Sequence, residues 1–556
     1  MRHALLAAAL AAAAPFAAST QATAQAVPGK PDLVVTLAID QFGQLLFDKW
    51  RGAYKSGLKR LADEGIIYDN AYQSHGITET CAGHSTLLTG KHPGHTGIVA
   101  NEWYDAAAGK QVYCVADDGF TQAHDAKARK VGPKLLVATT LGDWIKAQQP
   151  ASRVVVVSGK DRASLTMAGH HADAVFWYAD AAGFTTLIAH GEDAQAKLAP
   201  VAKVNAKAHA MAAAIPPWTY TEETCRALED SYQLGKVVWH SKLPPEMPSE
   251  DGKAPGKVRP LHIMDPLTVD AARELSDYYQ LGRRGVTDLL AVSLSATDFI
   301  GHGYGTQGPE MCDHIRRLDA GVGDFLTYLD GLGLNILLVV TGDHGGSDFA
   351  ERLARQGFES ARRISPKALL ADINAGLKQA LSLDYDTLVS PDSVQVYAVG
   401  KDGKALDESE RTKVVEAALA AFRQRPEIEQ AYGLTDLLNH KVTESAASDY
   451  SLEDRFSQSV MRGRSGDIIL AYKSGISVSP VRPTRFIMGH AGPYRHDTAV
   501  PIIFWWKGVK PQVRPLPADT TSIAPTLANI MGVTAPADLD GPCLDIGYPG
   551  ARPCRQ

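Results

Sequence analysis

The sequence predicts a doubly wound α/β/α sandwich, in which helices cover both faces of a mostly parallel sheet, with inserted cap regions. Three features lead to this fold class. Continuous apolar runs of strand length recur along the chain, amphipathic helical patterns lie between them, and Asp or His follows several of the runs. Runs without polar alternation are typical of strands buried on both faces, and their alternation with helices favours a parallel sheet.

Four apolar runs are the predicted central strands. They cover residues 33–39, 154–157, 289–294 and 336–340. A fifth run, 502–506, follows Pro501 and is expected to add a further core strand. Each of the four ends in polar residues, which indicates where the chain leaves the predicted sheet.

Two helical stripes accompany these strands. After the third run, apolar residues recur at spacings of three and four, at Ile315, Leu318, Val322, Phe325 and Leu329. This spacing places them on one face of a helix. Near the end of the chain, Ile523, Leu527 and Ile530 repeat the pattern before Gly532, which is expected to cap that helix.

Two stretches fit the alternation of strands and helices poorly. Residues 180–283 contain polar, Pro-rich segments, and residues 352–482 hold separate helix and strand patterns. We expect both to be insertions that cap one α/β domain spanning residues 27–556.

Residues 1–26 have the features of a secretory signal peptide. Arg2 gives a positive start, residues 4–18 are rich in Ala and Leu, and Ala24-Gln25-Ala26 provides a cleavage site. A membrane anchor is the alternative, but the run is short for a span of about 20 apolar residues. No later run is long enough to cross a bilayer. We therefore expect an exported protein without a membrane span, located in the periplasm or secreted.

The charge balance of the sequence disfavours one class of function, nucleic-acid binding. The 556 residues are 45% hydrophobic and 21% charged, and 56 basic against 62 acidic residues give a formal net charge of −6. This balance gives no electrostatic support for a nucleic-acid-binding surface. It still allows one small basic site for an anionic substrate. The sequence makes no prediction of oligomeric state.

The cysteines suit an oxidising compartment. They are Cys81, Cys114, Cys225, Cys312, Cys543 and Cys554. Their spacings do not match C-x-x-C zinc motifs, so we expect disulfides rather than metal thiolates. Sequence does not choose among the possible pairings. Cys543 and Cys554, which lie in one short tail rich in Pro and Gly, are the favoured pair.

Residue types that ligate metals follow three predicted strands. Asp40 ends the first run, Asp298 and His302 follow the third, and Asp343-His344 follow the fourth. In open α/β sheets ligands bind beyond the carboxyl ends of the strands, so these side chains are expected to meet at one sheet edge. Carboxylate and imidazole in this combination favour a metal site.

A nucleophile candidate follows the short run 66–68. The candidate is Thr80, in the segment Thr80-Cys81-Ala82-Gly83-His84-Ser85-Thr86. With Asp298/His302, Asp343-His344-Gly345-Gly346 and His490 in this order, the chain resembles the alkaline phosphatase superfamily, specifically phosphate-irrepressible alkaline phosphatases with a Thr nucleophile. The resemblance runs from about residue 32 to residue 527 and is interrupted by the two insertions.

The resemblance implies two Zn²⁺ per chain. It assigns one metal to Asp40, Asp343 and His344, and the other to Asp298, His302 and His490. Manganese, iron or cobalt could occupy the same donor set. His84 is expected to form structural hydrogen bonds rather than to bind a metal.

The resemblance also assigns the substrate-binding groups. Thr80 matches the nucleophile, and Asn101 matches a donor to a phosphate oxygen. Lys160 and Arg162 match the pair that distinguishes monoesterases from related phosphodiesterases. Some members of the superfamily hold magnesium at a third site. Because Lys160 is expected to take over part of that role, no Mg²⁺ is expected.

The chemistry of these residues agrees with the implied roles. A Thr hydroxyl is a poor nucleophile at neutral pH and needs a metal or a base to activate it. Two divalent ions can hold the attacking and leaving oxygens of an in-line displacement. Their charge is cancelled by three Asp carboxylates and a Thr80 alkoxide, so a monoester dianion also needs Lys160 and Arg162. We expect a metal-dependent alkaline phosphatase that hydrolyses small phosphate monoesters through a phosphothreonine at Thr80.

Three alternatives differ from this function. A sulfatase would contain a motif that resembles C-x-P-x-R, and the sequence from Cys81 to Ser85 does not match this motif. A phosphodiesterase or nucleotide pyrophosphatase shares the metals and Thr80 without requiring Lys160 and Arg162, and is the nearest alternative. A non-catalytic phosphate-binding protein of the cell envelope would not need a placed nucleophile. Relatives commonly have Pro where this chain has Ala82, a change that removes no reacting group.

Overall fold

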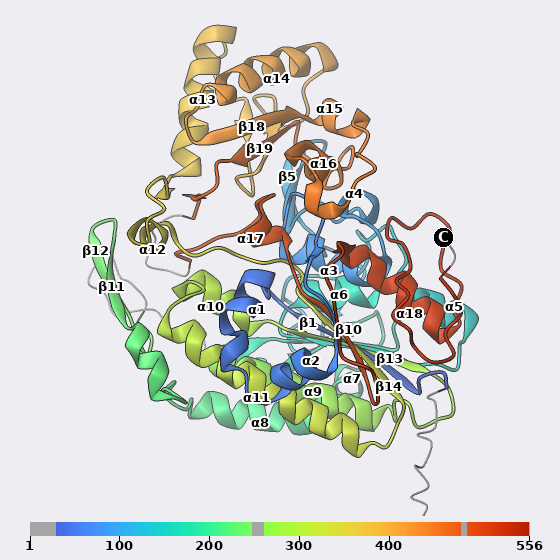
Figure 1. Cartoon of the computed structure of the whole chain (residues 1–556). Coiled ribbons are helices and arrows are strands. Elements are labelled where there is room, and N and C mark those ends of the chain that lie inside the picture. Colours follow the sequence, from blue (N-terminus) through green and yellow to red (C-terminus); the bar gives the residue numbers. More distant parts are fainter. Residues whose placement is uncertain (1–28, 247–260, 480–485, 555–556) are drawn as a thin grey trace, which may run out of the picture.

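The centre of the molecule is a nine-stranded sheet (Figure 1). The computed structural model describes residues 29–246, 261–479 and 486–554, so the predicted signal peptide lies outside the described residues. The strands, in spatial order, are β22 Gln512–Arg514, β2 Ile66–Tyr68, β21 Ile502–Trp506, β14 Ile336–Thr341, β1 Leu33–Ile39, β13 Asp288–Leu294, β7 Val154–Ser158, β8 Ala174–Tyr178 and β9 Phe184–Thr185.

The middle of this sheet is parallel. Strand β1 pairs with both β13 and β14, β13 pairs with β7, and β7 pairs with β8, all in parallel. Every residue of β1, β7, β13 and β14 is buried, as continuous apolar runs require. The fifth predicted strand is β21, which pairs with β14 in the antiparallel direction.

Helices cover both faces, which confirms the predicted sandwich. Alternate residues of β1 enter two cores: Leu33, Val35, Leu37 and Ile39 enter one, and Val34 and Ala38 the other, because side chains alternate along a strand. The first core is covered by α2 Gly57–Glu64, α9 Leu261–Tyr278, α10 Ala296–Tyr304 and α11 Pro309–Gly331. The second is covered by α3 Thr80–Thr89, α5 Leu141–Gln148, α6 Asp161–Ala168 and α18 Ile523–Met531.

Both predicted helical stripes are buried. The stripe from Ile315 to Leu329 lies on α11 in the first core. The stripe from Ile523 to Ile530 lies on α18 in the second core, and this helix ends at Gly532 with a left-handed φ of 70°. Glycine adopts this conformation without a Cβ clash, which explains the helix end.

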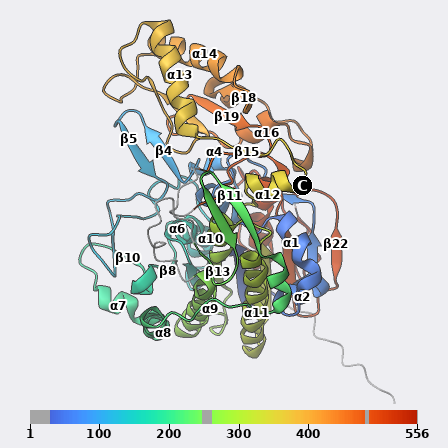
Figure 2. The same cartoon turned by 90° about the vertical axis from the view of Figure 1, so that its left-hand side faces the viewer.

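A second sheet stands above the sandwich (Figure 2). Its strands, in order, are β16 Leu388–Val389, β17 Gln395–Ala398, β19 Ile468–Tyr472 and β18 Ile428–Gly433. Helices α13 Pro366–Leu381 and α14 Glu408–Arg423 share a separate hydrophobic core with it. These elements lie within the predicted insertion 352–482.

The other predicted insertion, 180–283, contains parts of two kinds. Helix α8 Ala202–Ala213 and the hairpin of β11 Asp230–Leu234 and β12 Val237–Ser241 lie outside the sheet. Helix α9, by contrast, packs directly against β13 and β7 and so forms part of the sandwich. The boundaries of both insertions stay predictions.

Short elements complete the chain. The helices are α1 Gln44–Trp50, α4 Pro93–Thr96, α7 Ala194–Leu198, α12 Ala350–Arg355, α15 Leu434–Asn439, α16 Leu452–Ser457 and α17 Arg495–Thr498. The strands are β3 Ala71–Tyr72, β4 Glu102–Asp105, β5 Lys110–Tyr113, β6 Thr121–Gln122, β10 Leu187–Ile188, β15 Arg362–Arg363, β20 Ile476–Ser477 and β23 Ala518–Asp519.

Three disulfides cross-link the fold. They join Cys81 to Cys114, Cys225 to Cys312, and Cys543 to Cys554, the pair favoured from the sequence. Among the described residues, no helix is both long and apolar enough to cross a membrane.

Candidate active site

Four neighbouring parallel strands deliver the polar residues to one edge of the sheet. Asp40 follows β1, and Asp343 and His344 follow β14. Asp298 lies in the first turn of α10, directly after β13. Lys160 follows β7 and is the N-cap residue of α6. Because these strands run in register, their ends meet, as the predicted edge site requires.

One cluster forms around Asp343. Its Oδ2 lies 3.4 Å from Nε2 of His344, and that Nε2 lies 3.6 Å from Oδ1 of Asp40. On the other side, Nδ1 of His84 lies 2.9 Å from Oδ2 of Asp343. The potential ligand atoms of Asp40, His84 and Asp343 all lie within 4.8 Å of one another. All four side chains are fully buried.

A second cluster forms around Asp298. Its Oδ1 lies 3.3 Å from Nε2 of His302 and 3.4 Å from Nε2 of His490. The two Nε2 atoms lie 3.2 Å apart. The ring of His344 stacks on that of His490 with centroids 3.8 Å apart, so His344 lies between the two clusters.

The main chain fixes the orientation of three of these imidazoles. Nδ1 of His302, His344 and His490 donates to the carbonyls of Met488, Gly345 and Thr78 at 2.8, 2.9 and 2.7 Å respectively. With Nδ1 engaged in this way, Nε2 is the nitrogen of each ring that faces the carboxylates, which is how metal-ligating histidines are commonly held.

His84 is held differently. Its Nδ1 faces the carbonyl of Thr80 at 3.0 Å, and its Nε2 faces the hydroxyl of Ser293 at 2.9 Å. A carbonyl can only accept, so Nδ1 carries the proton and donates. This makes His84 a hydrogen-bond donor beside Asp343, although its position in the first cluster could not be read from the sequence.

These donors fit divalent metal ions. Carboxylate oxygens and imidazole lone pairs converge, and Oδ1 of Asp40 and Nε2 of His344 are buried without a hydrogen-bond partner in the described part of the chain. Buried polar atoms are rarely left unpaired, and cations satisfy such a donor set. The groups whose potential ligand atoms lie within 4.8 Å of one another are Asp40, His84 and Asp343, and Asp298, His344 and His490.

Two carboxyls of the site, Asp40 and Asp298, have opposite net shifts in pKa. Burial, and then the nearby Asp343, raise the pKa of Asp40 well above its ordinary range. Burial also acts to raise the pKa of Asp298, but His302 and Lys160 hold it well below that range. Burial, and then His344, lower the pKa of His490 to about 4, so this ring is neutral at the pH where metals bind.

Lys160 joins the clusters to the candidate nucleophile. Its ammonium lies 2.6 Å from Oδ2 of Asp40 and 2.5 Å from Oδ2 of Asp298. The same Nζ lies 3.4 Å from Oγ1 of Thr80, and Nη2 of Arg162 lies 3.5 Å from it. Thr80 is the first residue of α3, where the unpaired N–H groups of a helix favour anions.

Asn101 lies against the same helix start. Its Oδ1 accepts the N–H of Cys81 at 2.9 Å, and its own N–H donates to Oε2 of Glu79 at 2.5 Å. Because the amide oxygen is engaged, the amide nitrogen is the group turned away from Cys81, and it makes no hydrogen bond among the described residues. The Cys81–Cys114 disulfide links helix α3, which carries Thr80, to the segment directly after β5.

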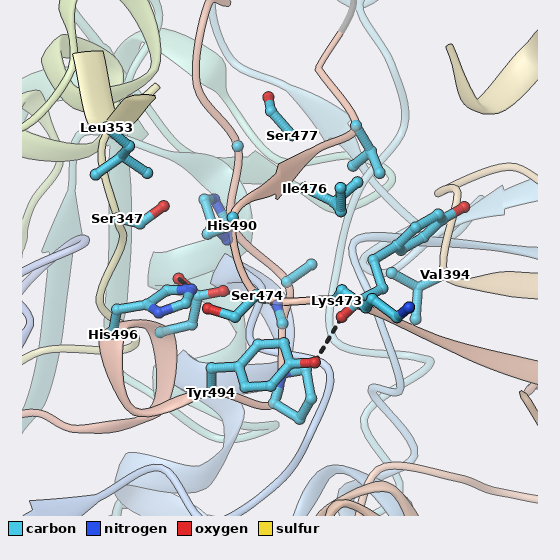
Figure 3. Close-up of a pocket in the computed structure, with 18 of the residues that line it drawn as sticks. Ser347, Leu353, Val394, Lys473, Ser474, Ile476, Ser477, His490, Tyr494 and His496 are labelled. Atoms are coloured by element: carbon cyan, nitrogen blue, oxygen red, sulfur yellow. Dashed lines mark hydrogen bonds and ion pairs between the residues drawn. The ribbon is translucent and has the colours of Figure 1, made fainter. Parts of the chain in front are cut away.

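A cleft of about 70 Å³ opens beside His490 (Figure 3). Its lining includes Lys473 and Ser474 from the loop after β19, Ile476 of β20, and Tyr494 and His496. Lys473 is exposed and has no ion pair in the described part of the chain. The cleft therefore offers a cation and hydroxyl groups next to the metal-ligating cluster.

Two buried residues of the site were not singled out by the sequence analysis. Glu79 precedes Thr80, and its pKa is raised to about 8 by burial and then by Asp392. Gln41 follows Asp40 and contacts both clusters. Its place next to a strand-end Asp was the one sequence signal available.

The fold and this edge site define a hydrolase of the alkaline phosphatase superfamily. The chain belongs to the type I phosphodiesterase / nucleotide pyrophosphatase family, which matches residues 34–480. This confirms the superfamily resemblance.

Individual relatives are alkaline phosphatases by name. "Alkaline phosphatase PhoK" of Sphingomonas sp is 34% identical over 537 residues, covering 93% of this chain and 91% of the relative. "Alkaline phosphatase PhoD" of Zymomonas mobilis is 32% identical, covering 94% and 89%. The crystal structure of wild-type alkaline phosphatase PafA superposes with a TM-score of 0.80 at 25% identity, covering 93% of this chain and 99% of that one.

Proposed function

We propose that this protein is an exported, metal-dependent alkaline phosphatase that hydrolyses small phosphate monoesters through a phosphothreonine intermediate on Thr80. One observation carries the proposal. Thr80 Oγ1 lies within 3.5 Å of both Lys160 and Arg162, beside two clusters whose donors fit divalent ions. A nucleophile, two cations for the phosphate and two metal-ligand sets thus share one sheet edge.

The two clusters would hold Zn²⁺, with Asp40, Asp343 and His344 at one ion and Asp298, His302 and His490 at the other. When bound, such ions act as Lewis acids that lower the pKa of a hydroxyl or a water. The donor set supports zinc, and the named phosphatase relatives support the use of divalent metals.

The side chains around Thr80 would bind and orient the phosphate. Arg162 can donate to two phosphate oxygens at once, and the Lys160 ammonium adds a second positive charge. The amide nitrogen of Asn101 would donate from the other side of the α3 N-terminus. These donors would keep the phosphorus in line with Oγ1 of Thr80.

The reaction would take two displacements. Oγ1 of Thr80 loses its proton and forms a bond to phosphorus while the bond from phosphorus to the leaving oxygen breaks, and the leaving alkoxide takes up the proton that Thr80 released. Water then attacks the phosphothreonine, the bond between phosphorus and Oγ1 breaks, and phosphate leaves. Thr80 regains its proton and the site is restored.

The leaving group would lie in the cleft beside His490. That cleft adjoins the Asp298 cluster and is lined by hydroxyl groups and Lys473. An alcohol carrying polar or negative groups suits these walls better than an apolar one.

Phosphodiester hydrolysis is the second candidate, because the family that matches this chain is named for it. Lys160 and Arg162 favour the monoester, whose extra negative charge they would match. Export is supported by the predicted signal peptide and by the three disulfides.

A paired assay tests the proposal. Rates on an aryl phosphate monoester and on the matching diester are compared, and the peptide containing Thr80 is searched for phosphate after acid quench. A monoester preference with phosphate on Thr80 is expected. A diester preference, or turnover without phosphate on Thr80, would overturn it.

A further inference from the structure

Gln41 adopts a backbone conformation that is unusual for its residue type. It has a φ of 64°, in the left-handed region where a Cβ is disfavoured. Glycine is the residue that usually fills such positions. Gln41 is also only 1% exposed, and its Oε1 has no hydrogen-bond partner in the described part of the chain. Both features disfavour Gln at this position, so stability alone does not explain it.

The contacts of Gln41 reach both metal-ligand clusters. Its main-chain N–H donates to Oδ1 of Asp343 at 2.9 Å, and its side-chain Nε2 donates to Oδ1 of Asp298 at 3.0 Å. It is also bonded covalently to Asp40. A single residue therefore hydrogen-bonds to one carboxylate of each cluster and is the chain neighbour of the third, Asp40.

The left-handed conformation accompanies these contacts. Oδ1 of Asp343 accepts the N–H of Gln41 and, at 3.0 Å, the N–H of His344. With Oδ1 held by two donors, Oδ2 is the oxygen that faces His344. The side-chain amide of Gln41 must turn its NH₂ group to Asp298, because a carboxylate oxygen only accepts.

The surroundings leave room for this side chain. A Cβ at Gly301, which lies in α10 between Asp298 and His302, would come within 1.7 Å of Oε1 of Gln41. A Cβ at Gly346 would lie 3.1 Å from Cδ of Gln41. The Gly in the Asp298-to-His302 segment is thus explained by the place of Gln41.

We infer that Gln41 is a positioning residue that holds the carboxylates of Asp298 and Asp343 in fixed relation to Asp40. It would thereby keep the two metal-ligand sets in a fixed position relative to each other. The inference rests on the proposed two-metal function of these clusters. Groups that hydrogen-bond to metal ligands commonly change metal affinity about 10- to 100-fold when removed.

The test compares Gln41→Asn, Gln41→Gly and a matched control. Asn tolerates the left-handed region and retains the N–H toward Asp343, but its amide is one methylene short of Asp298. Gly relieves the backbone strain and removes the amide. The control is Gln44→Asn. Gln44 is equally buried, also has an unpartnered Oε1, and donates to Asp48 at 2.9 Å, outside both clusters.

Three measurements are made on chelator-treated protein, two of them after reloading with Co²⁺ or Zn²⁺. Calorimetric titration gives the dissociation constant of each ion, the visible spectrum of Co²⁺ reports its coordination, and the thermal midpoint is taken without metal. For both Gln41 variants we expect one ion to bind about 10- to 100-fold more weakly, with an altered Co²⁺ spectrum. The metal-free midpoint should be unchanged, or higher for Gln41→Gly, and Gln44→Asn should bind both ions as the wild type does.

Two outcomes would overturn the inference, and a third would separate it from the proposed function. Unchanged affinities in both Gln41 variants would show that the carboxylates do not need Gln41. Equal weakening of both ions together with a lower metal-free midpoint would show a general structural role. A wild type that binds two ions but does not hydrolyse monoesters would contradict the proposed function and leave the role of Gln41 standing.

Discussion

Nε2 of His302 lies 3.2 Å from Nε2 of His490, and the Nδ1 atom of each ring is committed to a main-chain carbonyl. Two ring nitrogens therefore face each other and Oδ1 of Asp298. Such an arrangement is unfavourable unless a proton or a metal cation lies among these atoms. The geometry of these two histidines is the clearest reason to expect a metal here.

Removal of the candidate nucleophile is the first test. Thr80→Ala should lower monoester turnover by orders of magnitude, because no other hydroxyl replaces Oγ1 in the phosphothreonine step. Metal content should stay near that of the wild type, since Oγ1 belongs to neither ligand set. Steady-state rates and elemental analysis check both points, with Thr80→Ser as the control that retains a hydroxyl. Unchanged turnover of Thr80→Ala would rule out this nucleophile.

Loss of the two phosphate-facing cations should change substrate preference. The double variant Lys160→Ala/Arg162→Ala should lose about two to four decades of monoester rate, from about 1.5–3 kcal/mol for each charged hydrogen bond. The matching diester should lose about one decade or less, because it carries one negative charge fewer.

Lys160 also pairs with Asp40 and Asp298, so the single variant Arg162→Ala is the cleaner measure of charge selection. Its monoester-to-diester ratio should fall without a change in metal content. An equal loss on both esters would mean that the pair maintains the site rather than selects the substrate.

Metal removal should abolish turnover and lower stability. Ions that bind only the folded chain stabilise it by mass action, so chelation should lower the thermal midpoint, and two equivalents of Zn²⁺ should restore rate and midpoint together.

Metal binding should also weaken as pH falls, because protons compete for the ligands. Elemental analysis of protein purified without added metal gives the content, and full activity well below two metals per chain would contradict the two-metal site.

Glu79 predicts a pH dependence of stability. Its pKa is about 8 in the fold, against an ordinary value of about 4.3 when unfolded. The folded chain therefore binds more protons than the unfolded chain between these two pH values. The contribution of Glu79 to the free energy of unfolding is thus fully present at low pH and is lost as pH rises through about 8. Glu79→Gln mimics the protonated form and should remove this loss. Thermal midpoints from pH 5 to pH 9 should converge at the acidic end and favour the variant at the alkaline end.

The neighbour of Glu79 provides a check on that result. Burial raises the pKa of Asp392 to about 6, and the two carboxyls repel each other when both are ionised. The advantage of Glu79→Gln at alkaline pH should therefore shrink in the presence of Asp392→Asn. Midpoints of wild type and Glu79→Gln that run parallel across the whole range would contradict the raised pKa.

Lys473 should favour leaving groups that carry negative charge. For a carboxylated aryl phosphate, Lys473→Gln should lower kcat/KM by about two- to five-fold, the range expected of an exposed ion pair. The uncharged aryl phosphate should be unaffected, and added salt should reduce the difference.

Lys507 is the matched control for Lys473. It is exposed and follows β21 at the opposite edge of the sheet, where Trp506 pairs with Leu337 at the start of β14. Lys507→Gln should leave both substrates unchanged. A loss with Lys473→Gln that is the same for both substrates would place the leaving group elsewhere.

The sequence by itself determined the sandwich and the edge where the site lies. Strands buried on both faces are apolar at nearly every position, so 33–39, 289–294 and 336–340 could be identified without tertiary information. The rule that ligands bind beyond strand ends then selected Asp40, Asp298 and Asp343. The Cys543–Cys554 pair could be favoured because both cysteines lie in one short segment.

Only the tertiary structure decided the relations between distant residues. An apolar run has no direction, so the antiparallel pairing of β21 with β14 was not predictable. Spacing also says nothing of contacts across 257 positions, such as Gln41 to Asp298. Nor does it show that Nε2 of His84 faces the hydroxyl of Ser293, whereas Nε2 of His344 faces two carboxylates. Local sequence determines which side chains are apolar or can bind metals, but packing sets the distances and ring orientations on which the chemistry depends.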